Sequence, residues 1–215
     1  MIFISHFNLL LVWIYNNKSK FEYSDFFKLK RVYSKRYDLY QFIVNKYNLN
    51  TDEIVYLEFG VANGESFRWW LTNSSHSNSR FVGFDTFEGL PENWGTFYSK
   101  GDMFSNLPNI DDSRAQFAKG LFQDTLTAFI EKNRDLLNAD VRKVIHMDAD
   151  LYSSTLFVLT QLYPHLKKGD IILFDEFNVP MHEFKAYREF EKISYLKFRP
   201  VGAVNNFYQV CFEVA

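Results

Sequence analysis

The chain has 215 residues, a formal net charge of -2, and 47% hydrophobic and 19% aromatic residues. This length fits a single domain with a well-buried core, and the charged fraction of 23% is that of a globular chain, not a disordered one. The weak net charge gives no basic footprint for nucleic acid. The single cysteine, Cys211, excludes an internal disulfide and a cysteine zinc cage. It fits a reducing compartment, and we expect a cytoplasmic protein.

The first fifteen residues, MIFISHFNLLLVWIY, are almost entirely apolar. The run is shorter than the roughly 20 residues of a membrane-crossing helix, and no transmembrane span is expected. It also lacks the basic start and the small-residue cleavage site of a signal peptide. We expect a helix or strand packed on the domain, or a peripheral interaction surface. Association with a membrane surface is the alternative.

Residues 28–49 are basic and aromatic, and Val32, Leu39, Ile43 and Tyr47 recur near helical spacing. This pattern predicts a helix with one apolar face. A basic and aromatic run can bind nucleic acid, but it more often forms a solvated helix face whose lysine stems cover a core. Residues 1–50 are therefore predicted to form an N-terminal helical cap, and residues 51–215 the main domain.

Short, nearly continuous apolar runs follow at residues 53–60, 80–85, 142–148 and 170–175. Helical stretches lie between them at residues 64–73, 124–137 and 153–166. Such an alternation predicts a parallel sheet with helices on both faces. Residues 196–215 read as two antiparallel strands around the turn GAVNN, at an edge of the sheet.

The segment from Thr86 to Arg114 is rich in Gly, Pro, Asn and Asp. Loops of this length in one domain are uncommon and are usually lids or binding loops. Since it follows the second strand, it can cover the carboxyl ends of the strands, where open α/β sheets bind ligands.

The turn after the first strand, EFGVANGES (residues 58–66), predicts a cofactor site. Gly60 and Gly64 let the backbone approach a ligand closely, yet their spacing is not that of a dinucleotide or phosphate loop. Glu58 would repel phosphate and attract a cation such as the ammonium or sulfonium of S-adenosylmethionine. Asp85, at the end of the second strand, can accept hydrogen bonds from both ribose hydroxyls. The simpler alternatives are a tight turn and an Asx cap.

The sequence HMDADLYSST places Asp148 and Asp150 directly after a buried run. An Asp-x-Asp step serves metal-dependent glycosyl transfer, phosphoryl transfer or metal-assisted activation of a hydroxyl. Asp175 and Glu176 end the next strand, so these carboxylates can converge and bind a hard cation, Mg²⁺, Mn²⁺ or Ca²⁺. Asp148 is the predicted ligand and base, and Asp150 could share the base role. Alternatively, both cap the helix that begins near Ser153.

The other two chemistries fit less well. Aspartyl phosphatases carry their motif near the start of the domain, and a glycosyltransferase would leave the glycine turn and Glu58 without a role. No motif for methylating a base amino group is present. Among the histidines, His146 is expected to be buried structure, and His182 is a second candidate base.

Five motifs, EFGVANGES, GFDTFEGLPENW, GLFQDTL, HMDADLYSST and GDIILFDEF, resemble in order and spacing the macrocin O-methyltransferase family of metal-dependent class I S-adenosylmethionine enzymes, which methylate sugar hydroxyls on antibiotics. The resemblance covers about residues 53–190. It implies that one group of residues contacts the cofactor: Glu58, Gly60, Gly64 and Ser66 at the methionine end, Asp85 at the ribose, Phe122 near the adenine, and Val61, Thr86 and Asp148 as further contacts. It implies a cation held by Asp148, Asp175 and Glu176. The family usually has Asp-Asp where this chain has Asp175-Glu176, a departure that can change or weaken metal binding.

The sequence thus predicts a class I methyltransferase fold of the α/β class, with a mostly parallel seven-stranded sheet, an antiparallel C-terminal hairpin and helices on both faces. The predicted reaction is methyl transfer from S-adenosylmethionine to a hydroxyl of a sugar or related vicinal diol, assisted by Mg²⁺ or Mn²⁺. A glycan-processing glycosyltransferase and a degenerate S-adenosylmethionine-binding module are the alternatives. The expected partner is a small-molecule or glycan acceptor and not a nucleic acid; a homo-oligomer is left open.

Overall fold

One sheet of short, largely buried strands organises the molecule. The computed structural model describes residues 2–215, and side chains from residue 4 onward. The strands are β1 (Tyr23–Ser24), β2 (Ile54–Phe59), β3 (Arg80–Asp85), β4 (Ala115–Lys119), β5 (Arg142–Met147), β6 (Ile171–Phe174), β7 (Phe198–Val204) and β8 (Gln209–Val214). Their order is β1-β7-β8-β6-β5-β2-β3-β4, and only the pairs formed by β8 are antiparallel. Continuous burial explains why β2, β5 and β6 read as apolar runs.

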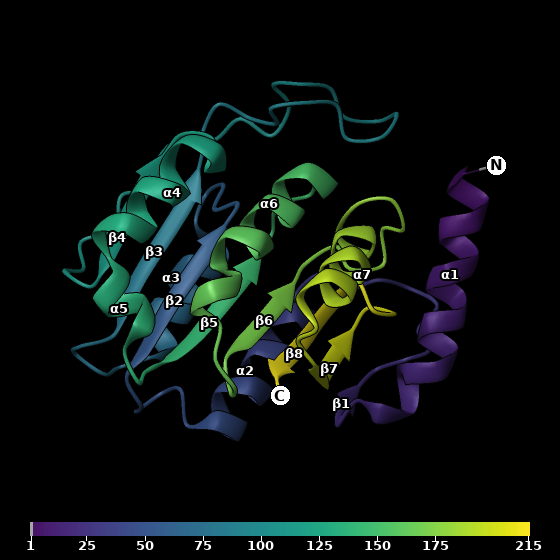
Figure 1. Cartoon of the computed structure of the whole chain (residues 1–215), viewed down its shortest axis with the longest axis horizontal. Helices are drawn as coiled ribbons and strands as arrows, with labels where there is room; N and C mark the ends of the chain where they lie inside the picture. Colours follow the sequence, from purple (N-terminus) through teal and green to yellow (C-terminus); the bar gives the residue numbers. More distant parts are fainter. Residues whose placement is uncertain (1) are drawn as a thin grey trace.

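Helices cover both faces of this sheet (Figure 1). They are α1 (Ile2–Asn17), α2 (Lys35–Tyr47), α3 (Glu65–Asn73), α4 (Phe122–Lys132), α5 (Arg134–Asn138), α6 (Tyr152–Leu162) and α7 (Glu183–Ser194), with 3-10 turns η1 (Lys18–Lys20) and η2 (Tyr163–His165). Helices α4 to α7 lie on one face and α2 and α3 on the other. Each face has its own hydrophobic core. The fold is therefore the expected mixed α/β arrangement with a mostly parallel sheet.

The register of the central strands aligns the predicted site residues. Phe59 pairs with Met147, and Met147 pairs with Phe174, so the residues after them stand in a row at one edge of the sheet. Backbone bonds extend this alignment: the Asp148 amide donates to the Phe59 carbonyl and the Asp175 amide to the Met147 carbonyl, both at 2.9 Å. This edge carries Gly60, Asp148 and Asp175 together.

The strand count was predicted one too low, because the described residues form eight strands. Strand β4 was missed because AQFAK is short and only partly buried, so it has no continuous apolar run. Strand β1 has only two residues and pairs with β7. As a result the C-terminal hairpin lies inside the sheet, between β1 and β6, and not at its edge.

Two helix predictions also need correction. The helix expected over residues 28–49 begins at Lys35, and Val32 lies outside it with an exposed side chain. The helix expected over 124–137 is two helices that meet at Asn133. Whether residues 1–50 form a separate cap remains a prediction.

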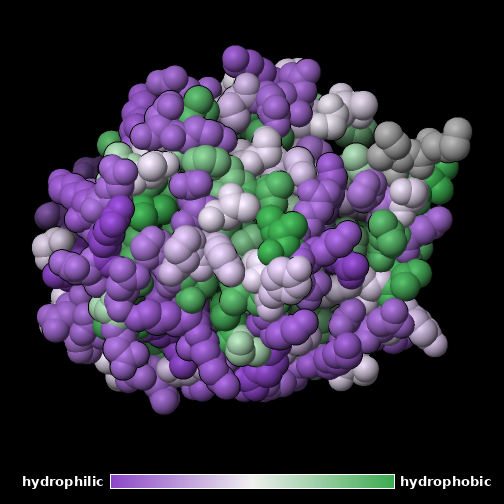
Figure 2. Space-filling view, viewed as in Figure 1, coloured by the Kyte–Doolittle hydropathy of each residue, from purple (hydrophilic) through white to green (hydrophobic). Residues whose placement is uncertain are grey.

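The apolar N-terminus is a helix that packs on the domain through Leu10 and Trp13. Several of its other apolar side chains are exposed, and hydrophobic residues accordingly appear at the edge of the molecule in Figure 2 where Figure 1 places α1. Among residues 2–215, no helix combines the length and apolar character that crossing a membrane requires.

Candidate active site

The turn after β2 is held by glycine for steric reasons. Gly60 has a φ of +94°, and a Cβ there would lie 1.8 Å from the backbone oxygen of Asp148. Gly64 has a φ of +75° and is the N-cap of α3. Any side chain at residue 60 would push the β2 turn away from the β5 turn. Glycine therefore permits the close approach of the two strand ends.

Asp85, at the end of β3, is tied to this turn. Its Oδ2 accepts hydrogen bonds from the amides of Val61 and Ala62, both at 2.8 Å, and its Oδ1 accepts one from Phe87 at 2.7 Å. Asp85 therefore fixes the shape of the glycine turn, and its side chain also lines the adjoining cavity.

The carboxylates after β5 and β6 converge, but not as the predicted trio of Asp148, Asp175 and Glu176: Asp148 belongs to two close groups, one with Asp175 and one with Glu176. Ligand atoms of Asp148, Asp150 and Glu176 lie within 4.8 Å of one another. The same limit holds for His146, Asp148 and Asp175. Because the chain turns sharply after β5, Asp150 adopts a left-handed conformation with a φ of 57°. One compact acidic cluster thus forms at the carboxyl edge of the sheet.

Proximity and burial act together on the acidic cluster. Desolvation, reinforced by the charge of Asp175, raises the pKa of Asp148 well above its usual value. Desolvation and the charges of Asp175 and Asp85 raise the pKa of Asp150 to about 7. Desolvation and the charge of Asp148 raise the pKa of Glu176 as well. The carboxyl groups of the cluster therefore keep their protons to a higher pH than usual, unless a bound cation offsets their charge.

Tyrosine hydroxyls partner two of these carboxylates. Tyr33 Oη donates to Asp175 Oδ2 at 2.8 Å, and Arg36 Nη1 donates to Tyr33 Oη at 2.6 Å. Tyr208 Oη donates to Glu176 Oε1 at 3.0 Å. The second oxygens, Asp175 Oδ1 and Glu176 Oε2, are buried and have no hydrogen-bond partner among the described residues. Two buried oxygens thus retain their capacity to bind a ligand.

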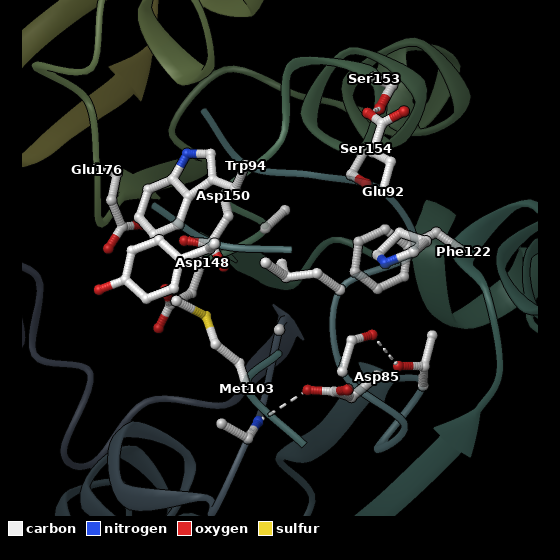
Figure 3. Close-up of a pocket in the computed structure, with 18 of the residues that line it drawn as sticks. Asp85, Glu92, Trp94, Met103, Phe122, Asp148, Asp150, Ser153, Ser154 and Glu176 are labelled. Atoms are coloured by element: carbon white, nitrogen blue, oxygen red, sulfur yellow. Dashed lines mark hydrogen bonds between the residues drawn. The ribbon is translucent and has the colours of Figure 1, made fainter. Parts of the chain in front are cut away.

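A cavity of about 580 Å³ connects the glycine turn with the acidic cluster. In Figure 3, Asp148, Asp150 and Glu176 gather at one end, with Asp85 and Phe122 at the other. This volume is typical of a small-molecule site. The lining residues are Tyr33, Gly60, Ala62, Asp85, Thr86, Gly89, Leu90, Pro91, Glu92, Trp94, Tyr98, Met103, Leu121, Phe122, Gln123, Asp148, Ala149, Asp150, Ser153, Ser154, Glu176 and Tyr208.

The long segment after β3 forms one wall of this cavity. Trp94 and Tyr98 both line it, and their rings stack with centroids 5.0 Å apart. Glu92 reaches across to α6, where Ser153 Oγ donates to Glu92 Oε1 at 2.7 Å. The segment therefore covers the carboxyl ends of the strands, as a binding loop would.

The predicted cofactor residues divide into two groups. Gly60, Asp85, Thr86, Phe122 and Asp148 line the cavity, whereas Glu58, Val61, Gly64 and Ser66 do not. Glu58 is buried and accepts a hydrogen bond from Tyr56 Oη at 2.5 Å. Contact of the second group with the cofactor remains a prediction.

The histidines lie in different surroundings. His146 is fully buried, and its ring nitrogens lie 2.8 Å from Tyr56 Oη and 3.2 Å from Tyr40 Oη, as expected of a structural residue. His182 immediately precedes α7, and desolvation lowers its pKa. It is absent from the cavity lining, so its proposed role as a second base has no geometric support.

Sequence reasoning missed Tyr33, Tyr208 and Glu183. Tyr33 was assigned to a helix, but it lies in the segment before α2, from which its hydroxyl reaches Asp175. Glu183 is fully buried at the start of α7, and its Oε2 accepts a hydrogen bond from the Glu176 amide. Only the short spacing of Glu183 from the strand-end pair hinted at its position.

The residues fit the ligands that the sequence suggested. Clustered carboxylates with two unpartnered buried oxygens suit an oxygen-seeking cation such as Mg²⁺ or Mn²⁺. The close backbone approach at Gly60, the carboxylate of Asp85 and the ring of Phe122 suit a nucleoside-containing cofactor. Asp148, Asp150 and Glu176 line the same cavity as the proposed cofactor residues, whereas Asp175 lies behind it and is absent from the lining.

Comparisons with known proteins identify a family and a fold for this chain. The family described as Macrocin-O-methyltransferase (TylF) matches residues 32–208. The chain is 37% identical over 82 residues to the demethyldecarbamoylnovobiocin O-methyltransferase of Streptomyces niveus, covering 37% of this chain and 28% of that protein. It is 33% identical over 88 residues to the mycinamicin III 3''-O-methyltransferase of Micromonospora griseorubida, covering 38% and 31%. The match therefore spans less than a third of either relative.

Solved structures support the fold. The crystal structure of the calicheamicin methyltransferase CalS11 superposes with a TM-score of 0.65 at 21% identity, covering 86% of this chain and 80% of that one. At this identity the likeness concerns the fold alone.

Proposed function

Because the chain belongs to the macrocin O-methyltransferase family, we propose that it transfers a methyl group from S-adenosylmethionine to a hydroxyl of a sugar or a related vicinal diol. The observation that carries the proposal is the single cavity joining the glycine turn and Asp85 to the acidic cluster. Such a cavity can hold a methyl donor and an acceptor side by side. Both relatives are named as O-methyltransferases, which makes a hydroxyl group the first acceptor class to test.

Each end of the cavity has a proposed task. Gly60 gives the cofactor close access to the backbone, Asp85 accepts hydrogen bonds from the ribose hydroxyls, and Phe122 packs against the adenine. The methyl group moves from the sulfonium to the acceptor oxygen, and S-adenosylhomocysteine leaves. Holding donor and acceptor together supplies much of the rate enhancement.

The acceptor hydroxyl must lose its proton during the transfer. Asp148 is the proposed base, and Asp150 lines the same end of the cavity and can share that role. Asp148, Asp175 and Glu176 would hold a divalent cation, preferably Mg²⁺ or Mn²⁺. In support, Asp148 shares one close group with Asp175 and another with Glu176. When bound, the cation supplies positive charge that orients and polarises the acceptor hydroxyl. Glu176 keeps one oxygen free for it, because Tyr208 occupies only Oε1.

The proposal is tested by assaying a panel of sugar and diol acceptors with S-adenosylmethionine, with and without a chelator. We expect methyl transfer that the chelator abolishes and Mg²⁺ restores. Asp148→Asn should lower the rate by about 100-fold or more, because both base and ligand are impaired. Asp135→Asn, an exposed change on α5, serves as the matched control and should leave the rate unchanged.

Transfer that persists unchanged in chelator and in Asp148→Asn would refute the metal mechanism. Binding of S-adenosylhomocysteine without transfer to any acceptor would favour a binding module. Thermal stabilisation by a nucleotide sugar and Mn²⁺, with none by S-adenosylhomocysteine, would favour a glycosyltransferase.

A further inference from the structure

Residues 1–31 carry chemistry that the proposed function does not use. The family match begins at residue 32, so α1 and the segment after it lie outside the matched region. These residues include five basic and two acidic ones, although the whole chain has a net charge of -2. Helix α1 itself contains no Asp, Glu, Lys or Arg. This part of the chain therefore joins an uncharged apolar helix to a basic segment.

Helix α1 is apolar on two opposite sides. Leu10 and Trp13 are buried against the domain, whereas Ile4, Leu11 and Tyr15 are 64%, 49% and 74% exposed. The three exposed residues follow one another at spacings of seven and four, so they line one side of the helix. A surface helix normally turns polar side chains to water. The outer side of α1 instead has the composition of a contact surface.

The segment after β1 extends this apolar surface. Phe27 and Leu29 are 66% and 96% exposed. Lys18 connects them to the helix, because its Nζ lies 5.6 Å from the centroid of the Tyr15 ring and 5.8 Å from that of Phe26. The Phe26 ring in turn contacts the Phe27 ring, with centroids 5.7 Å apart. Large apolar side chains that gather in this way mark interaction sites, whereas isolated ones do not.

The backbone of this segment is held in place by the turn between β7 and β8. Asn206 Oδ1 accepts a hydrogen bond from the Lys28 amide at 2.8 Å, and Asn206 Nδ2 donates to the Lys28 carbonyl at 2.7 Å. Asn205 forms the same pair of bonds with Val32, at 2.9 and 3.0 Å. The exposed side chains are thus presented by an ordered backbone, which lowers the entropic cost of binding a partner.

The lysines of this surface have no acidic counterpart. The ion pairs of the described residues include none with Lys18, Lys28 or Lys30. Of the two acids in residues 1–31, Glu22 forms its ion pairs with basic residues of α2 and β7, and Oδ1 of Asp25 is buried. The surface therefore combines apolar side chains with uncompensated positive charge.

We propose that α1 and residues 26–30 form a peripheral docking surface for an anionic lipid bilayer. Apolar side chains of such a surface enter the boundary between headgroups and acyl chains, and its lysines lie at the lipid phosphates. The contact is with one face of the bilayer, since α1 has only 16 residues and is fastened to the domain by Trp13. The inference does not depend on the proposed reaction.

Charge distinguishes a bilayer from a second copy of this chain as the occupant. A two-fold contact between copies sets the same surface against itself. The unpaired lysines of one copy would then face those of the other, and like charges repel. An anionic bilayer supplies the opposite charge and the apolar phase together.

The test measures flotation of the full-length protein with lipid vesicles. Vesicles of phosphatidylcholine alone are compared with vesicles of phosphatidylcholine and phosphatidylglycerol in equal parts. The double variant Phe27→Ser/Leu29→Ser removes apolar side chains, and Lys28→Gln/Lys30→Gln removes positive charge. All four side chains are exposed, so neither variant opens a cavity in the core.

We expect the unaltered protein to float with the phosphatidylglycerol vesicles and to stay largely free with phosphatidylcholine alone. Phe27→Ser/Leu29→Ser should lower binding by at least about 10-fold, because two large apolar side chains no longer enter the bilayer. Lys28→Gln/Lys30→Gln should lower it by about 30-fold at low salt. High salt should weaken binding of the unaltered protein, because it screens the attraction to the lipid phosphates.

Two controls make matched changes elsewhere on the molecule. Leu107→Ser replaces a half-exposed leucine in the segment after β3, and Lys132→Gln an exposed lysine at the end of α4. Both should bind vesicles like the unaltered protein. Every variant should melt within about 2 °C of it, since all the altered sites are on the surface. A loss of binding then cannot come from unfolding.

The proposal is wrong if the unaltered protein fails to bind phosphatidylglycerol vesicles, or if both double variants bind as well as it does. It is also wrong if the protein ignores vesicles and sediments as a dimer that Phe27→Ser/Leu29→Ser dissociates. The surface would then be an interface between copies. Methyl transfer is not measured, so a failure of the proposed reaction leaves this result intact.

Discussion

At the scale of single residues, Asp85 holds the glycine turn in shape and is also the proposed acceptor for the ribose hydroxyls. Both of its oxygens already accept backbone amides, two from the glycine turn and one from Phe87. Each carboxylate oxygen can accept more than one hydrogen bond, so the proposed ribose contacts do not compete with these. The same carboxylate can therefore hold the glycine turn and accept the proposed ribose hydrogen bonds.

Asp85→Asn tests this dual role. The amide group must replace one oxygen, and its N–H₂ would face a backbone donor. We expect affinity for S-adenosylhomocysteine to fall by about 2 kcal/mol, roughly 30-fold, as for the loss of a charged hydrogen bond. Calorimetric titration measures it. Glu88→Gln, an exposed change nearby, is the control, and unaltered affinity in Asp85→Asn would remove Asp85 from the cofactor site.

At the scale of elements, the ends of β5 and β6 carry a conflict between burial and charge. In the metal-free protein, desolvation raises the pKa of Asp150 from 3.8 to about 7. The folded chain therefore holds a proton that the unfolded chain has released, and its stability falls as the pH rises through this window. The raised pKa values of Asp148 and Glu176 act in the same direction.

We accordingly expect the melting temperature of the protein in chelator to fall between about pH 5 and pH 8. Mg²⁺ should reduce the fall, because a bound cation favours the ionised carboxylates. Asp150→Asn should also flatten the profile. Differential scanning calorimetry across this range provides the measurement. A melting temperature that rises with pH in chelator would show that the cluster is not desolvated as described.

The sequence predicted those elements whose hydrophobic pattern lies within a few consecutive residues. Strands β2, β5 and β6 are buried runs, and the parallel sheet then brings Asp148 beside Asp175 and Glu176. Elements defined by distant contacts were missed. Strand β4 exists because AQFAK pairs with β3, and Tyr33 reaches Asp175 because its segment is not helical. Glu183 accepts a hydrogen bond from the Glu176 amide only because α7 docks against that turn, which no local pattern encodes.

At the scale of the whole molecule, α1 is fastened to the domain by one large side chain. Trp13 is buried and packs its ring 5.0 Å from that of Phe177, with Phe21, Phe184, Tyr187, Phe207 and Phe212 around it. Phe177 follows Glu176 directly. Trp13, which anchors the N-terminal helix, and Phe177, which follows Glu176 of the acidic cluster, thus belong to one aromatic core.

Trp13→Ala should therefore destabilise the molecule through the cavity it leaves. We expect the free energy of unfolding to fall by about 3 kcal/mol or more, as for other buried tryptophans. Val12→Ala, on the exposed side of the same helix, should change it by less than about 0.5 kcal/mol. Urea denaturation checks both variants. Equal stability of the two would mean that α1 contributes little to the fold.

The central claim is that one cavity holds S-adenosylmethionine and a divalent cation next to each other. X-ray diffraction at the manganese absorption edge, on crystals grown with Mn²⁺ and S-adenosylhomocysteine, tests it most directly. The account predicts one anomalous peak bounded by Asp148, Asp175 and Glu176, with the cofactor ribose at Asp85. A cofactor bound without any manganese peak at these carboxylates, or a peak elsewhere only, would contradict it.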